Sequence, residues 1–189
     1  MMIKSDKKKE DPIKKEESVE EKLKTIEENT NSTFGSSNFS GSVITKVYAN
    51  TTAGFSIVTY AGSSSGSKTV AHGLSEAPQW IAIKNRTDNS RSWFIYVPVT
   101  KYDSTPQNRY FRFNSDDSHA SGNVFNNTAP TNKVFSIQDA GSLNTNGSGK
   151  NYVAYCWHSV EGYSKIGGWY EGNGSTNGPF VHTGFKPTW

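Results

Sequence analysis

Residues 152–157 read Tyr152-Val153-Ala154-Tyr155-Cys156-Trp157, an apolar run that follows the turn-rich segment from Asn144 to Gly149. A short apolar run bounded by turn residues is typical of a buried β-strand. Six further segments carry a strand signal, and stretches rich in Ser, Gly, Asn and Asp separate them. These segments are Val43 to Tyr48, Phe55 to Tyr60, Trp80 to Lys84, Ser92 to Val97, Arg109 to Phe113 and Lys133 to Ile137.

The body of the chain shows no convincing 3.6-residue hydrophobic period, so we expect strands rather than helices there. Many short strands joined by turns are typical of a sandwich or a small barrel. Because 33% of the residues are hydrophobic and 13% are aromatic, we expect rings to supply much of a thin core. We therefore predict an all-β fold, an antiparallel, jelly-roll-like β-sandwich, over residues 43–162.

The composition changes sharply near Glu28. Residues 1–28 carry eight Lys and nine Asp or Glu, and residues 29–42 form a Ser/Asn/Gly linker. Val19, Leu23 and Ile26 recur at helical spacing, so a short helix is one interpretation of the tail. A solvated charged tail is the interpretation that we favour. The tail lacks the apolar region of a secretion signal, and no run reaches the length of a membrane span.

A partial internal repeat lies at the C-terminal end. Phe55-Ser56, Tyr60-Ala61-Gly62, His72-Gly73-Leu74, Pro78 and Trp80 are echoed by Tyr163-Ser164, Tyr170-Glu171-Gly172, His182, Gly184-Phe185, Pro187 and Trp189. The copies are offset by roughly 110 residues, which is the size of a domain. We therefore interpret residues 163–189 as the truncated start of a second module. We expect this segment to pair with an edge of the first module or to contact another chain.

Several linked motifs follow one another along the body. They are Phe55-Ser56-Ile57-Val58-Thr59-Tyr60, His72-Gly73-Leu74, Ala77-Pro78, Ile83-Lys84-Asn85-Arg86, Trp93 with Tyr96, Asn126-Asn127-Thr128-Ala129-Pro130-Thr131, Val134-Phe135 and Tyr152-Val153-Ala154-Tyr155-Cys156. In this order they resemble an uncharacterised β-rich repeat-domain family found in large virion and tail-fibre-associated proteins of tailed phages, especially marine ones. The resemblance covers about residues 34–189. It implies a structural or host-adsorption role in the virus particle, with other virion or fibre subunits as partners, and it names no catalytic residue.

Residue types that perform catalysis are present but scattered. The four histidines, His72, His119, His158 and His182, show no metal-binding spacing. For His72 and His182, at matching positions of the repeat, we favour a ring nitrogen bonded to a turn carbonyl. The acidic residues Asp103, Asp116, Asp117 and Asp139 suit solvated turns better than a catalytic pair. Cys156, the only cysteine, fits a small buried hydrophobe. We therefore predict no enzymatic activity, no metal and no cofactor.

Aromatic rings beside polar side chains carry the best case for a binding site, since a ring stacks on a sugar while its neighbours bond the hydroxyls. The candidate ligand-binding residues are Trp93 and Tyr96 beside Arg86 and Arg91, and Tyr102 beside Arg109. The alternative, which we favour, is that the rings form the core. That alternative covers Trp80, Trp93, Tyr110, Phe113, Tyr155 and Trp157.

The sequence thus predicts a phage virion structural or tail-fibre-type module with a role in host-surface adsorption. A carbohydrate-binding module detached from a larger secreted protein is the second hypothesis, with a host cell-surface glycan as its partner. Residues 29–189 carry twelve basic and eight acidic side chains without a cluster, so we expect no nucleic-acid partner. A homo-oligomer would suit a short fibre module, which gains stability from its neighbours.

Overall fold

The described part of the chain folds into nine β-strands and two short 3-10 turns. The computed structural model describes residues 41–43, 45–63, 66–98, 106–117, 119–139, 141–166 and 173–187. The strands are β1 (Thr45–Asn50), β2 (Phe55–Ala61), β3 (Ser67–Ala71), β4 (Trp80–Asn85), β5 (Phe94–Tyr96), β6 (Arg109–Arg112), β7 (Ala120–Ser121), β8 (Val134–Gln138) and β9 (Asn151–Trp157). The turns are η1 (Pro106–Asn108) and η2 (Gly141–Leu143). All seven predicted segments contain a strand, whereas β3 and β7 were not predicted.

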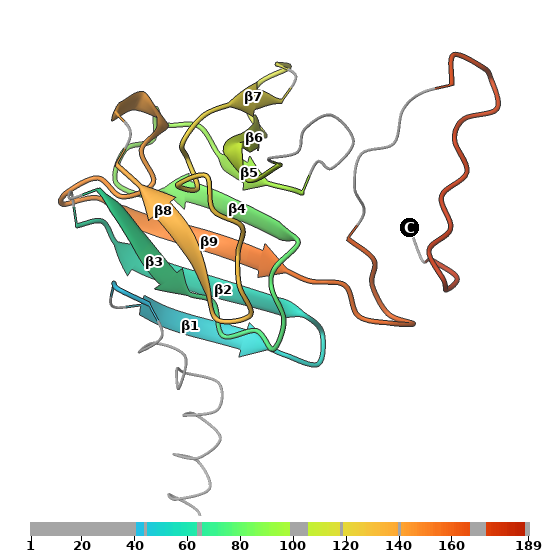
Figure 1. Ribbon diagram of the computed structural model, residues 1–189, viewed down its shortest axis with the longest axis horizontal. Coiled ribbons are helices and arrows are strands. Elements are labelled where there is room, and N and C mark those ends of the chain that lie inside the picture. The colour runs from blue at the N-terminus through green and yellow to red at the C-terminus, as the bar shows by residue number, and fades with distance from the viewer. Residues whose placement is uncertain are drawn as a thin grey trace, which may run out of the picture.

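Seven of these strands form one large antiparallel sheet, in the order β1-β2-β9-β4-β5-β6-β7. The apolar run at residues 152–157 lies in β9, which pairs with β2 on one side and with β4 on the other. The remaining strands, β3 and β8, pair antiparallel as a separate two-stranded ribbon. This ribbon lies across the large sheet as a second layer (Figure 1). The predicted all-β antiparallel sandwich is therefore confirmed, with layers of unequal size.

The main core fills the space between the large sheet and the ribbon. Alternate residues of β2 and β9 are buried, as expected for strands with one covered face. Tyr60 and Tyr152 stack with ring centroids 5.1 Å apart, and Tyr60 also meets Phe135 of β8 edge-on. The other buried members are mainly aliphatic and include Val47, Val58, Val70, Ile81, Ile83 and Ile137. The core of the described residues is thus built from aliphatic chains as much as from rings.

A buried polar network closes one end of the sandwich. The Tyr60 hydroxyl donates to the carbonyl oxygen of Thr145 at 2.9 Å. The amide of Asn146 donates to the Gly66 carbonyl oxygen at 3.1 Å, and its Oδ1 accepts from the Ser63 backbone N–H at 3.0 Å. Because Asn146 is fully buried, these bonds satisfy polar groups that water does not reach. The network ties the loop before β9 to the loop after β2.

The other end of the large sheet is fixed by a tight hairpin between β1 and β2. Asn50 Oδ1 accepts a hydrogen bond from the Ala53 N–H at 2.9 Å within the turn. Gly54 follows with a φ of 64°, a left-handed conformation that favours glycine. A Cβ at this position would lie 2.7 Å from the carbonyl oxygen of His158. The hairpin therefore packs directly against the chain that leaves β9.

The two ends of the chain differ in what the structure describes. Residues 1–40 lie outside the described residues, so the charged tail and most of the linker remain predictions. At the linker's end, the Ser42 N–H donates to the Thr69 carbonyl oxygen at 2.9 Å, which docks residue 42 onto β3. Residues 173–187 contain no strand and run outside both sheets (Figure 1). Across the described ranges, no helix has the length and apolar character needed to span a membrane.

Candidate functional site

The outer face of the large sheet, opposite the β3–β8 ribbon, carries aromatic rings. The alternation that buries Ala154 and Cys156 in β9 turns Tyr155 and Trp157 toward this outer face. Trp157 pairs with Phe55 of β2 and with Trp80 of β4 in the strand register. Three rings from three adjacent strands therefore lie side by side in one row.

Further contacts extend this row into an aromatic ladder. The ladder comprises Phe55, Trp157, Tyr155, Trp93, Phe113 and Trp80. In that order the ring centroids are 4.9, 6.2, 6.1, 6.3 and 5.8 Å apart. Several of these rings pack on a second buried cluster, which consists of Ala82, Ile95 and Val97. The ladder is thus a continuous row of ring contacts on a hydrogen-bonded sheet, within the spacing at which rings attract one another. Phe113 is exposed, and the other five rings are partly buried.

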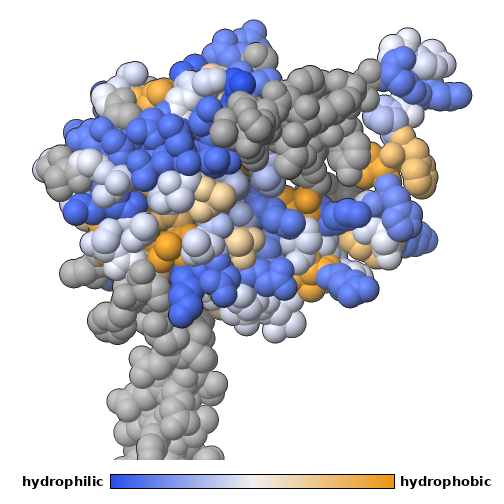
Figure 2. All heavy atoms as spheres, viewed as in Figure 1, coloured by the Kyte–Doolittle hydropathy of each residue, from blue (hydrophilic) through white to orange (hydrophobic). Residues whose placement is uncertain are grey.

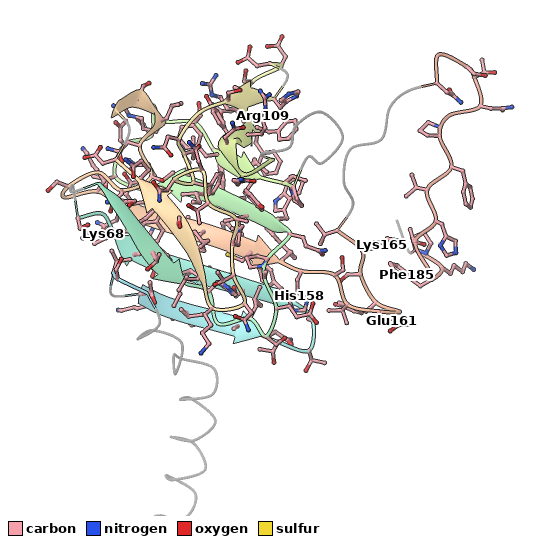
Figure 3. All side chains as sticks on the ribbon, in the orientation of Figure 1. Lys68, Arg109, His158, Glu161, Lys165 and Phe185 are labelled. Carbon is pink, nitrogen blue, oxygen red and sulfur yellow. The ribbon has the colours of Figure 1, made fainter. Side chains whose placement is uncertain are left out.

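A groove of about 860 Å³ opens at the Phe55 and Trp157 end of the ladder. Those two rings contribute to its floor, and residues 162–166 form one wall. The opposite wall comes from the C-terminal segment and includes Phe185 and Lys186. Figure 3 shows Lys165 and Phe185 close together beside the end of β9. The groove therefore combines an aromatic floor with walls from two segments that are distant in sequence.

The first wall of the groove is a hydrogen-bonded turn. The backbones of Val160 and Ser164 exchange two hydrogen bonds of 2.9 Å. The Ile166 N–H donates to the Ser159 hydroxyl at 2.9 Å, and that hydroxyl donates to Gln79 Oε1 at 2.6 Å. These bonds anchor the turn to the segment just before β4.

The second wall is attached through Lys165. Its Nζ donates to the carbonyl oxygen of His182 at 3.0 Å. Beyond this contact the C-terminal segment stands away from the sheets, and Phe180 is 88% exposed. In Figure 2 the visible face of the sandwich is largely hydrophilic with scattered apolar residues, and apolar atoms also show on this segment. The groove is consequently the place where the segment meets the aromatic ladder.

The predicted pair Trp93 and Tyr96 does not form one surface. Trp93 joins the aromatic ladder, whereas Tyr96 is 4% exposed and meets Phe125 edge-on at 5.4 Å in the main core. The two residues are three positions apart, and an odd separation along a strand places side chains on opposite faces. Tyr96 is therefore removed from the candidate site, while Trp93 remains in it.

The predicted arginines do not gather around the ladder either. Arg91 is engaged by Asp88, whose Oδ2 lies 3.0 Å from its Nε. Arg86 lines a separate pocket of about 240 Å³ with Lys46, at the far ends of β2 and β9 from the groove. Arg109 donates to the hydroxyl of Ser121 in β7. Tyr102 lies outside the described residues, so its pairing with Arg109 remains a prediction.

The favoured alternative, that the rings form the core, holds for only part of the set. Tyr110 is 3% exposed and packs in the main core as expected. Trp80, Trp93, Tyr155 and Trp157 are only partly buried, on the outer face. Phe113, which contacts Trp80 and Trp93 and does not line the groove, is 60% exposed. The tryptophans therefore pack on a second buried cluster, made by Ala82, Ile95 and Val97 on the outer face, and not in the main core.

Two of the reactive groups that the sequence offers, His72 and Cys156, are held inside the fold. His72 is fully buried, with Nε2 3.0 Å from the Thr131 carbonyl oxygen and Nδ1 accepting from the Leu74 N–H at 3.1 Å. The predicted structural role of His72 is thus confirmed, and burial lowers the pKa of its imidazole to about 4. Burial likewise raises the pKa of the Cys156 thiol to about 12. In the described part of the chain, no group of three or more His, Cys, Asp or Glu is placed to hold a metal.

Sequence reasoning missed the groove residues Phe55, Trp157, Lys165 and Phe185. Trp157 was assigned to the core, and Phe185 to the opening of a second module. Strict alternation of buried and outward side chains along β9 is the sequence signal that predicts Trp157 on the outer face. Residues 183–187 reach the groove through the hydrogen bond from Lys165 to the His182 carbonyl oxygen, which joins residues 17 positions apart. The sequence carries no local signal for this contact.

The fold and site define an all-β sandwich protein with an aromatic face on one sheet. A family model described as a domain of unknown function, DUF7483, matches residues 26–189. The chain therefore belongs to this family, and the match includes the sandwich, the ladder and the C-terminal segment. The division of the chain at residue 162 remains a prediction. Comparisons with curated proteins and with solved structures found no match.

Proposed function

We propose that this chain is a structural and adhesive module of a tailed-phage virion, of the tail-fibre type, whose aromatic face takes part in host-surface adsorption. The aromatic ladder is the single observation that carries the proposal, because its rings remain partly accessible on the outer face, and contiguous apolar surface of this kind often marks a binding site. The ordered motifs that resemble phage virion modules supply its biological context. Other virion or fibre subunits would be the structural partners.

The ladder suits adhesion because its rings are already ordered. Ring contacts join neighbouring members from Phe55 to Trp80, and backbone pairing holds the strands beneath them. Binding to such a surface costs little additional side-chain entropy. A module of this kind supports adhesion without needing to change shape.

The chemistry of the described residues supports binding rather than catalysis. A general base must reach a substrate and a nucleophile must ionise near neutral pH. The His72 nitrogens are both occupied inside the core, and the Cys156 thiol is fully buried with a raised pKa. Asp117 is engaged by Ser115 and Arg112 in an exposed turn. We therefore propose a protein without enzymatic activity.

Immuno-electron microscopy of cultures that produce the chain tests the virion proposal. Antibodies against residues 41–187 should decorate the surface or tail of virus particles. Labelling confined to cytoplasmic complexes, away from particles and cell surfaces, would contradict it.

A carbohydrate-binding module is the second candidate, and the groove is the observation that favours it. Its volume of about 860 Å³ lies within the range of ligand pockets. Phe55 and Trp157 offer ring faces, and Lys165 and Thr183 offer polar groups around them. Stacking of a sugar on the rings with hydrogen bonds at its edge requires this combination.

A glycan array tests this candidate with two matched substitutions. Phe185→Ser removes a ring from the groove wall and should abolish retention of the bound sugars. Phe113→Ser removes an exposed ladder ring outside the groove and should leave retention unchanged. An array on which the unmodified chain retains no sugar would argue against carbohydrate binding.

A further inference from the structure

The charged side chains that line the groove beside the aromatic ladder are positive. Lys165 and Lys186 line it, and no acidic side chain is among the described residues that do so. Thr183 adds a hydroxyl group. The groove therefore presents aromatic rings, one hydroxyl and two ammonium groups together.

The position of Lys165 is set by the fold. Its Nζ donates one hydrogen bond to the His182 carbonyl oxygen. An ammonium carries three N–H donors, so two of the three remain for another acceptor. The bond keeps the charge at the junction of the two walls, and exposed Lys186 adds a second charge on the opposite wall.

We propose that the groove binds an acidic polysaccharide, with the rings stacking on sugar faces and the two lysines pairing with carboxylate or sulfate groups. This inference rests on the carbohydrate-binding candidate and names its ligand class. Charge complementarity argues for it, because carboxylate or sulfate groups would pair with the two ammonium groups that line the groove, whereas a neutral sugar offers them no charge. The excess of twelve basic over eight acidic side chains across residues 29–189 adds a long-range attraction for a polyanion.

The chain offers an internal control for net charge. Lys46 and Arg86 line the smaller pocket at the other ends of β2 and β9. With a rise of about 3.3 Å per residue, a strand of this length spans about 20 Å, which exceeds the screening length in physiological salt. Removing these two charges alters the net charge as much as removing the lysine pair, but leaves the groove unchanged.

The experiment measures binding of the full chain to polygalacturonate and to the same polymer with its carboxylates methyl-esterified. We expect the esterified polymer to bind about tenfold more weakly, because exposed ion pairs are individually modest but add up. Lys165→Gln with Lys186→Gln should cause a similar loss toward polygalacturonate. Lys46→Gln with Arg86→Gln should cause less than a twofold change, and Lys165→Arg with Lys186→Arg should restore binding.

The outcomes separate this inference from the function on which it rests. Equal losses from the groove pair and the control pair would overturn it, because the attraction would then follow net charge alone. Binding of neutral glycans only, lost in the Phe185→Ser chain, would overturn the charge requirement and leave carbohydrate binding intact. Absence of binding to both polymers and to the array would overturn both. Lys186→Gln alone, at an exposed position, repeats the test if the double substitution unfolds the chain.

Discussion

The backbone N–H of His158 donates a 2.9 Å hydrogen bond to the carbonyl oxygen of Gly54. This bond joins the β1–β2 hairpin to the chain that leaves β9, immediately beside the groove. Both ring residues of the groove floor adjoin this bond in the sequence, since Phe55 follows Gly54 and Trp157 precedes His158. The geometry of this junction therefore sets the position of the floor.

Gly54→Ala should lower the free energy of unfolding by about 2–4 kcal/mol, because it combines a positive φ with a steric clash. The clash arises 2.7 Å from the His158 carbonyl oxygen. Gly149→Ala is the matched control, since Gly149 has a φ of 65° but nothing within 4 Å of an added Cβ. It should cost only about 1 kcal/mol. Equal losses in urea unfolding of the two variants would contradict close packing at this junction.

Stability should fall as the pH drops below about 6.5, because His72 resists protonation in the folded state. Burial lowers its pKa from 6.5 to about 4, so protons bind more readily to the unfolded chain in this window. The loss should reach up to about 3 kcal/mol near pH 4 and level off below it. NMR titration of the folded protein checks the cause. A His72 imidazole that titrates near 6.5 in the folded chain would refute it.

Tyr155→Ala should break the ladder in its middle, since this ring contacts both Trp93 and Trp157. The lost packing should lower the free energy of unfolding by about 2–4 kcal/mol and change the near-UV circular dichroism. Phe113→Ala removes a ring that is 60% exposed and should cost less than about 1 kcal/mol. A larger loss at Phe113 than at Tyr155 would mean that the ladder is not organised around β9.

Asn146→Ala should lower the free energy of unfolding by about 1–3 kcal/mol, because it leaves buried partners without hydrogen bonds. Amide hydrogen exchange at Ser63, whose N–H is bonded to Asn146, should accelerate with it. Asn132→Ala is the matched control, because Asn132 is exposed in the loop before β8. It should leave the free energy of unfolding and the exchange rate at Ser63 nearly unchanged. Unaltered exchange at Ser63 in the Asn146 variant would exclude the network as the link between the two loops.

Much of the fold could be predicted because strand signals are local. The apolar run in β9 and the alternation in β2 each mark a strand whatever the rest of the chain does. β3 was missed because only Val70 and Ala71 of its five residues are apolar, so its burial comes from pairing with β8 rather than from its own pattern. Such pairing is a tertiary effect that overrides local propensity.

The candidate site was harder to predict than the fold. Trp93 was identified, but its partners were chosen by closeness in sequence, and Tyr96 faces the other side of the sheet. The true neighbours of Trp93 are Tyr155 and Phe113, which reach it from β9 and from the end of β6. Strand order decides these contacts, and strand order cannot be deduced from strand positions alone.

Hydroxyl-radical footprinting of the aromatic side chains, with and without bound polygalacturonate, most directly tests whether the outer face of the large sheet is the contact surface. The binding account predicts protection of Phe55, Tyr155 and Trp157, with Phe180 equally oxidised in both samples. Protection of Phe180 alone, with the three ladder rings unchanged, would contradict it.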